Sequence, residues 1–309
     1  MKFGVQTFLD GVEWQQVEDA WRFLEDQTPY ESIWTYDHFV PPTANPDGPA
    51  LEGWVALAAL AAQTTRVRIG CLVSGVTYRN PALLGKMTTT IDHISRGRVV
   101  AGIGAAWHEP EHRFFGWDFP ATGERMDRLE EAAEILSGML SGANRLDFKG
   151  RYYSVNGAPI NPPGIQRPIP LLIGGGGEKR TLRTAARFAN IVNVAGTPAH
   201  VKRKIDVLAA HCRDVGRDPA EIAISIQSAL IVTENQGLLD RALGVYANRY
   251  GITTAEAQRE LPIGDAEHVY GVIRQYEDIG VELFIQMAQG PWRTDIYERI
   301  AEQVLSRFA

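Results

Sequence analysis

Three stretches of the sequence carry residue types that could do chemistry, and the first is Asp37-His38, which follows a short apolar run. A histidine exchanges protons near neutral pH, so this pair could supply a general acid or base. Neighbouring side chains of an extended segment point to opposite sides, so a direct hydrogen bond between Asp37 and His38 is not expected. The alternative is a structural histidine at the rim of the fold.

The second stretch, His108-Glu-Pro-Glu-His112, matches the H-E-x-x-H pattern of zinc peptidases. That chemistry requires both histidines on one regular helical turn. Pro110 lies between them and lacks an N–H, so His108 and Glu109 can at most begin a helix. We therefore expect no metal at this motif, and instead an active-site loop in which Trp107 and His108 face the pocket.

The third stretch is Gly174-Gly-Gly-Gly177, between the apolar residues 170–173 and a helix-favouring run. A turn without Cβ atoms lets backbone N–H groups approach an anion, and a helix N-terminus adds partial positive charge. Three arginines then share one helical face, namely Arg180, Arg183 and Arg187. The pattern favours a phosphate site, with a flexible turn and a solvated basic face as the alternative. It is neither a P-loop nor a dinucleotide fingerprint, because their Lys-Ser/Thr and spaced glycines are missing.

The two cysteines, Cys71 and Cys212, are too few for a disulfide framework, and we expect a reducing, cytoplasmic setting. Cys71 lies in an apolar run with no neighbour in sequence that would lower the pKa of its thiol. It is therefore expected to be a core residue rather than a nucleophile. Neither a Ser-His-Asp arrangement nor a retaining pair of carboxylates follows from the spacing.

The elements that must position these stretches alternate along the chain. Apolar runs predict strands at 2–8, 32–36, 67–73, 98–102, 170–173, 190–194, 222–230 and 281–287. Helical spacing follows each run, at 13–27, at 53–63, after Asn80-Pro81 with the apolar face Leu84, Met87, Ile91 and Ile94, at 123–141, after the glycines, and at 198–216, 265–279 and 293–308. Eight such units predict parallel strands that close into a (β/α)8 barrel, with the site at the C-terminal strand ends.

Two segments break this alternation and are interpreted as insertions in a single domain, residues 1–309. Residues 143–168 contain Pro-rich turns and a small hairpin with residues 148–153 as one arm, whereas residues 231–262 look mostly helical. The formal net charge of −6 argues against general nucleic-acid binding. No apolar run approaches the roughly 18 residues of a membrane span, and the first residues predict a strand rather than a secretion signal.

Four pieces together resemble the luciferase-like flavin and deazaflavin oxidoreductases. They are Ile33-Trp-Thr-Tyr-Asp-His-Phe39, Val76-Thr-Tyr-Arg-Asn-Pro81, Ser95-Arg-Gly-Arg-Val-Val-Ala-Gly-Ile-Gly104 with the Trp-His-Glu-Pro-Glu after it, and the glycine run. They fall in order within residues 1–195, and the barrel count extends the match to the end of the chain. The residues of these four segments most resemble the branch that uses coenzyme F420, an 8-hydroxy-5-deazaflavin.

The resemblance implies a role for each candidate residue. Asp37 and His38 would stand beside the deazaflavin ring, with His38 as the proton donor or acceptor and Asp37 tuning it. A bulge, often a non-proline cis peptide, would back the ring, formed by Cys71, Leu72, Val73 and Ser74. Gly104, Ala105 and His108 would line the cofactor or substrate side, with His108 the next candidate for proton exchange. The cofactor phosphate would be received by Gly174, Gly175, Gly176 and Gly177.

The sequence also departs from one branch of that family. F420-dependent sugar-phosphate dehydrogenases carry an acidic residue where this chain has Ala105, and a Trp where it has Pro41-Pro42. The substrate is therefore open. The leading hypothesis is a homodimeric F420-dependent oxidoreductase that transfers a hydride between the deazaflavin C5 and a small organic molecule. The alternatives are an FMN-dependent monooxygenase of the same fold, a non-catalytic flavin-binding protein, and a phosphosugar isomerase or aldolase barrel.

Overall fold

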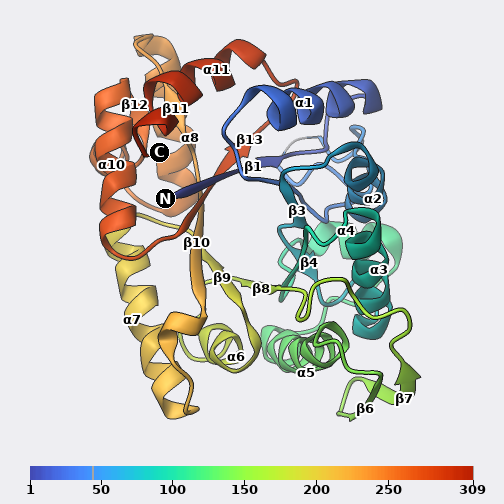
Figure 1. Cartoon of the computed structure of the whole chain (residues 1–309). Helices are drawn as coiled ribbons and strands as arrows, with labels where there is room; N and C mark the ends of the chain where they lie inside the picture. The colour runs from blue at the N-terminus through green and yellow to red at the C-terminus, as the bar shows by residue number, and fades with distance from the viewer. Residues whose placement is uncertain (44, 309) are drawn as a thin grey trace.

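The computed structural model describes residues 1–43 and 45–308, and its centre is a closed barrel of parallel strands (Figure 1). The strands are β1 (Lys2–Thr7), β2 (Ser32–Thr35), β3 (Arg68–Cys71), β5 (Val99–Gly104), β8 (Leu171–Gly174), β9 (Ile191–Val194), β10 (Ala223–Ser228) and β13 (Leu283–Ala288). They pair in the order β3-β2-β1-β13-β10-β9-β8-β5, and β3 also pairs with β5. That last pairing closes the sheet and confirms the predicted (β/α)8 barrel.

Eight helices follow the strands in turn and surround the barrel (Figure 1). They are α1 (Trp14–Gln27), α2 (Gly53–Gln63), α3 (Pro81–Ile94), α5 (Thr122–Leu140), α6 (Thr181–Phe188), α7 (Pro198–Asp214), α10 (Ala266–Asp278) and α11 (Thr294–Gln303). Short 3-10 helices lie at Pro219–Glu221 and Leu305–Phe308. In the described residues, no helix combines the length and the apolar character needed to cross a bilayer.

The apolar core has two layers, because successive strand residues face alternately into the barrel and out toward the helices. The inner layer is a small cluster of Trp34, Leu72, Val100, Leu172 and Ile285. The outer layer lies between strands and helices and contains fully buried strand residues such as Val5, Ile33, Ile69, Ile103 and Ile173. Burial on both faces explains why these strands are continuous apolar runs in the sequence.

Helix α3 shows how the local sequence sets an element. Asn80 caps its N-terminus by accepting a hydrogen bond from the N–H of Ala82 at 2.9 Å, and Pro81 occupies the first turn. Ile94 was expected on its apolar face but is 40% exposed. It follows Leu84 by ten residues, a rotation of about 280°, which puts it at the edge of the apolar stripe.

The first insertion is an antiparallel hairpin of β6 (Arg145–Lys149) and β7 (Ser154–Pro159), packed on α5 through an apolar cluster. The prediction that residues 148–153 form one arm was wrong, because the arm ends at Lys149. Glu131 of α5 accepts hydrogen bonds from the N–H groups of Arg151, Tyr152 and Tyr153. Those donors therefore form the turn instead of extending the strand.

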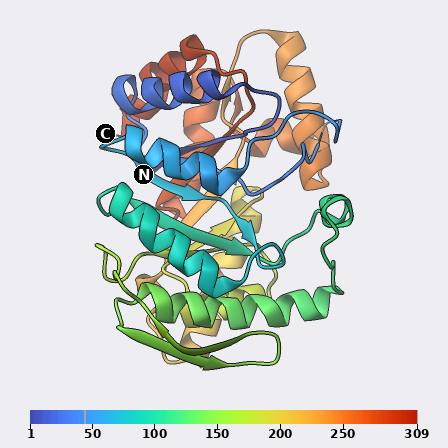
Figure 2. The same cartoon turned by 90° about the vertical axis from the view of Figure 1, so that its right-hand side faces the viewer.

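The second insertion follows β10 and contains β11 (Ile231–Val232), α8 (Gln236–Tyr250), α9 (Thr254–Glu260) and β12 (Ile263–Gly264). β11 and β12 pair in parallel, so the segment begins and ends at one place. Its two helices enclose an apolar cluster of their own, made of Ala229, Leu243, Ala247, Ala257, Leu261 and Ile263. In Figure 2, α8 lies on the same side of the molecule as α4 (Glu109–Phe115), an additional helix after β5.

Candidate active site

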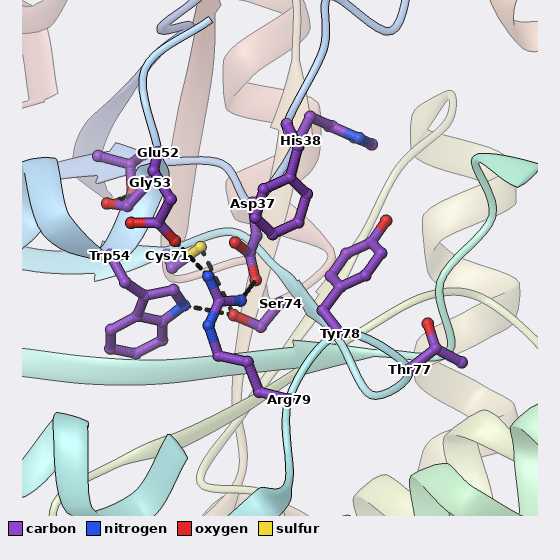
Figure 3. A network of polar contacts seen from close by, with 12 residues as sticks. Asp37, His38, Glu52, Gly53, Trp54, Cys71, Ser74, Thr77, Tyr78 and Arg79 are labelled. Atoms are coloured by element: carbon purple, nitrogen blue, oxygen red, sulfur yellow. Dashed lines mark hydrogen bonds and ion pairs between the residues drawn. The ribbon is translucent and has the colours of Figure 1, made fainter. Parts of the chain in front are cut away.

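The carboxylate of Asp37 lies in a buried ion pair just beyond the end of β2. Arg79 donates to Asp37 Oδ2 and also to Glu52, the residue that caps α2 (Figure 3). Burial raises the pKa of Asp37, and the Arg79 charge opposes this shift without cancelling it. Its other oxygen, Oδ1, is buried and has no hydrogen-bond partner among the described residues. Asp37 thus keeps one free acceptor.

His38 points to another side of the chain and contacts a different carboxylate, Glu111. As expected from their extended backbone, Asp37 and His38 do not share a hydrogen bond. The Nδ1 atom of His38 lies 2.9 Å from Oε1 of Glu111. The rings of Tyr36, Trp107 and His108 surround the imidazole, with centroids 5.3–5.6 Å away. His38 is therefore held in one orientation at the rim.

Glu111 is fully buried, and several residues near the C-terminal ends of the barrel strands form hydrogen bonds with its carboxylate. Besides His38, it accepts from the hydroxyl of Tyr78 and, at 3.0 Å, from the N–H of Phe39. Burial acts to raise the pKa of Glu111, but the bonds from His38, Tyr78 and Phe39 outweigh it and leave the pKa lowered. Glu111 is accordingly ionised near neutral pH.

The H-E-x-x-H motif does not bring its histidines to one ligand position. His108 precedes the first turn of α4, and Pro110 lies within that turn. The Nδ1 of His112 donates to the carbonyl of His108 at 2.8 Å, and its Nε2 lies 2.7 Å from the Thr77 hydroxyl. Burial lowers the pKa of His108, which favours its neutral form near pH 7.

Another arrangement of possible metal ligands does arise at the rim. Ring nitrogens of His38 and His108 and an oxygen of Glu111 lie within 4.8 Å of one another. The two oxygens of Glu111, however, already accept the hydrogen bonds from His38, Tyr78 and Phe39. A satisfied carboxylate favours a hydrogen-bond network over a cation site.

The predicted bulge lies between β3 and β4 (Ser74–Gly75), and the Leu72–Val73 peptide bond is cis. Gln6 of β1 donates to the carbonyl of Leu72 at 2.5 Å from inside the barrel. The Val73 side chain occupies the space that side chains on neighbouring strand ends would need. A Cβ at Gly104 would lie 2.8 Å from Cγ2 of Val73, and one at Gly174 would lie 3.0 Å from its Cγ1. The lack of a side chain at these two glycines therefore leaves room for Val73.

The residues beside the bulge lie partly in the core and partly at the C-terminal ends of the strands. Cys71 is fully buried in the outer core, as expected, so its side chain faces away from the barrel interior. Ser74 accepts a hydrogen bond from the indole of Trp54 at 2.6 Å (Figure 3). Ala105 follows Gly104 at the end of β5 and is partly exposed at the rim.

The glycine run turns sharply at Gly175, whose φ of +126° is unfavourable for any other residue. The Gly175 N–H donates to the carbonyl of Asn193, so it is not free for an anion. In the described part of the chain, the N–H groups of Gly176 and Gly177 have no backbone or side-chain acceptor. Helix α6 starts only at Thr181, later than the sequence suggested, and a Cβ at Gly177 would lie 2.7 Å from the Thr181 hydroxyl.

Two arginines of the basic face predicted for α6 form ion pairs with a neighbouring helix. Arg180 pairs with Asp127 and Arg187 with Glu130, and both carboxylates belong to α5. These two arginines are therefore paired with carboxylates of the facing helix, while the phosphate site at the glycines stays a prediction. A residue that sequence reasoning missed, Lys204 of α7, comes closer: its Cε would lie 3.4 Å from a Cβ at Gly176.

Residues 1–262 match the family model described as luciferase-like monooxygenase. The chain belongs to the luciferase-like monooxygenase family. The family resemblance noted in the sequence is thereby confirmed over most of the chain.

Known relatives of this luciferase-like chain include F420 enzymes. It is 34% identical over 149 residues to the F420-dependent glucose-6-phosphate dehydrogenase of Kineococcus radiotolerans, covering 48% of this chain and 43% of that protein. Among solved structures, it is similar to an F420-dependent secondary alcohol dehydrogenase in complex with an F420-acetone adduct, with a TM-score of 0.85, 17% identity and coverage of 99% and 98%. It is also similar to monooxygenase RslO1 from Streptomyces bottropensis, with a TM-score of 0.79, 19% identity and full coverage of both chains.

Sequence reasoning missed one further residue of the candidate site, Glu111. It lies inside the stretch His108-Glu-Pro-Glu-His112, whose sequence pattern points to the two histidines and to Glu109. Pro110 gave the usable signal. A proline is favoured in the first turn of a helix, so it predicts that a helix begins here and that residue 111 belongs to its first turn.

Proposed function

We propose that the protein is an F420-dependent oxidoreductase that acts on a small organic substrate. The observation that carries this proposal is the position of His38, a proton-exchanging side chain held at a barrel strand end. The relative from Kineococcus, which uses F420, supports the choice of cofactor. When bound, the deazaflavin supplies hydride transfer at C5.

The residues present fit such a cofactor at three points. The buried Oδ1 of Asp37 has no partner among the described residues and can accept a hydrogen bond from a ring donor. The Leu72–Val73 bulge presents an apolar surface between β3 and β5 that can support a ring. Gly176, Gly177 and Lys204 combine N–H groups without backbone or side-chain acceptors in the described chain with a nearby cation, as a phosphate site requires.

Lys204 is currently engaged by Glu178, which accepts from Lys204 Nζ at 2.7 Å and also pairs with Arg203. The hydrogen bonds from Arg203 and Lys204 lower the pKa of Glu178 to about 2. A phosphate at the glycine run would compete with Glu178 for Lys204. Because salt screens the attraction between Lys204 and a phosphate, we expect phosphate affinity to fall as ionic strength rises.

The proposed substrate is not a sugar phosphate. Ala105 and Pro41-Pro42 replace residues that the sugar-phosphate dehydrogenases carry. The rim arginine, Arg79, is already paired with Asp37 and Glu52, so it offers no free charge to a substrate phosphate. His38 instead favours a substrate that gains or loses a proton on oxygen.

The second candidate is an FMN-dependent monooxygenase, which the family model and the likeness to RslO1 favour. Titrating the protein with F420 and, separately, with FMN under the same conditions distinguishes the two, with fluorescence as the readout. We expect clearly tighter binding of F420. Tighter binding of FMN would contradict the cofactor assignment and support the monooxygenase.

We further propose that the chain acts as a single-domain homodimer. Large apolar side chains remain exposed on neighbouring helices, for example Val55 of α2 at 70% and Leu83 of α3 at 55%. A second copy would bury such surface. Light scattering coupled to size-exclusion chromatography tests this, and a monomeric mass at micromolar concentration would contradict it.

A further inference from the structure

The contact between His38 and Glu111 has a defined proton arrangement. Glu111 is an ionised carboxylate and can only accept hydrogen bonds. Nδ1 of His38, at 2.9 Å from Oε1 of Glu111, must therefore carry the proton. In the neutral imidazole, Nε2 is then left as the acceptor. Among the described residues, Nε2 of His38 has no hydrogen-bond partner.

Glu111 is itself fixed from three separate segments of the barrel. It belongs to α4 after β5, and Phe39 donates to it from the end of β2. Tyr78 donates to it from the loop between β4 and α3. A fully buried carboxylate with these donors has one orientation, so the imidazole that it binds has one orientation too.

We propose that Glu111 is a positioning residue that holds His38 as its Nδ1–H tautomer, so that Nε2 exchanges a proton with an oxygen of the substrate. This inference rests on the proposed function and narrows its substrate class to compounds interconverted between C–OH and C=O. In the oxidation direction, the substrate O–H bond breaks and an Nε2–H bond forms, while the C–H bond of the same carbon breaks and its hydride would reduce the deazaflavin of the proposed function. The positive charge on the imidazolium is then compensated by Glu111. The reverse transfer protonates the oxygen of a carbonyl substrate.

The same logic operates wherever a carboxylate orients a catalytic histidine and stabilises its charged form. Neutralising such a carboxylate removes the charge compensation and frees the tautomer while leaving the shape of the site. The loss should therefore appear in turnover rather than in binding.

The first test reads the tautomer directly and requires no turnover. Nitrogen NMR of the protein labelled with ¹⁵N-histidine, with His38 assigned by comparison with His38→Gln, should find Nδ1 protonated and Nε2 unprotonated in the neutral ring. Glu111→Gln should turn this signal into a mixture of tautomers. An Nε2–H tautomer in the unmodified protein would overturn the inference, and this reading stands even if the Glu111 variant does not fold.

The second test compares Glu111→Gln with Glu109→Gln, the same change at an exposed carboxylate on the same helix. With F420 and a small secondary alcohol or ketone that the unmodified protein turns over, Glu111→Gln should lower kcat by about 10²–10⁴-fold. KM and F420 affinity should change by less than about threefold, and Glu109→Gln should leave all three unchanged. A folded Glu111→Gln variant with normal kcat would overturn the inference.

The two proposals can fail separately. If the unmodified protein does not bind F420, the proposed function fails, while the NMR result still decides what Glu111 does to His38. If the protein binds F420 and oxidises alcohols, but Glu111→Gln behaves like Glu109→Gln in both tests, only the role of Glu111 fails.

Discussion

Arg79 donates to the buried carboxylate of Asp37, and this ion pair connects the end of β2 to the residues that lead into α3. The side chain of Asp37 is almost completely shielded from solvent. Removing one member of a buried pair leaves the other charge without compensation, which costs more than the pair itself contributes. The protein should therefore be sensitive to the loss of either member of this pair.

Replacing Arg79 with Met should destabilise the protein by about 3–5 kcal/mol near neutral pH. Burial already raises the pKa of Asp37, and losing the Arg79 charge raises it further. A raised pKa means that the folded protein binds this proton more readily than the unfolded chain, so acidification relieves the strain. The destabilisation should shrink as pH falls below the raised pKa, toward the ordinary value of 3.8. Urea unfolding at several pH values measures this.

Two variants serve as controls for this experiment. Arg187→Met breaks an exposed pair with Glu130 and should cost at most about 1 kcal/mol. Adding Asp37→Asn to Arg79→Met removes the buried charge and should recover part of the lost stability. A pH-independent penalty in Arg79→Met would show that its cause is lost packing and not the unpaired carboxylate.

For Glu25 we expect the opposite pH dependence of the free energy of unfolding. Its carboxylate accepts from the N–H groups of Thr65, Arg66 and Val67, which ties α1 to the start of β3. Burial acts to raise its pKa, but these hydrogen bonds prevail and lower it from 4.5. The stabilisation is therefore fully present above pH 4.5 and is lost as pH falls through the lowered pKa.

Glu25→Gln should accordingly cost about 1–3 kcal/mol at neutral pH and much less in acid. Unfolding by urea across the acid range is the measurement, with the exposed neighbour in Asp26→Asn as the matched control. Equal penalties at neutral and acid pH would mean that the carboxylate charge has no role in this contact.

Gly176→Asp should weaken F420 binding by about tenfold or more, since the added carboxylate repels phosphate and competes for its donors. Gly176 suits this test better than Gly175, whose φ of +126° makes any substitution strained. Gly176→Ala is the control, because its Cβ would meet Lys204 at 3.4 Å, close to ordinary contact. Equal F420 affinity in the two folded variants would assign the phosphate to another site.

His38→Ala should lower kcat by about 10²–10⁴-fold, the usual contribution of a general acid or base. F420 affinity should change by less than about tenfold, because Asp37, the bulge and the glycine run remain in place. Steady-state rates with reduced F420 and a screened substrate, beside a cofactor titration, separate the two effects. Normal turnover combined with lost cofactor binding would make His38 a binding residue and His108 the next candidate for proton exchange.

The fold followed from the sequence because barrel strands are buried on both faces and read as short apolar runs between helices. All eight barrel strands and the helix entry at Asn80-Pro81 were predicted this way. The partners of charged side chains were not, because they come from elements distant in sequence. Arg180 contacts α5 across 53 residues, and His38 contacts Glu111 across 73.

The packing of the Val73 side chain against Gly104 and Gly174 shows why the role of a glycine is difficult to predict from the sequence. In the sequence, Gly104 and Gly174 were interpreted as cofactor contacts. The structure shows first a steric reason for both, since each admits the Val73 side chain from a neighbouring strand end. A glycine in the sequence indicates that some group comes close to the backbone at that position. Only the fold shows whether this group belongs to a ligand or to another part of the same chain.

The helical segment after β10 has a consequence for how this barrel can change. α8 and α9 enclose their own apolar cluster, and β11 and β12 bring the two ends of the segment together. Residues 231–264 therefore amount to a cassette with adjacent attachment points. An exchange of this cassette for a foreign one would remove the hydrogen bond that the Tyr250 hydroxyl donates to the carbonyl of Gln227 in β10. The contacts described above for the Asp37 ion pair and the Glu111 network include no residue of the cassette.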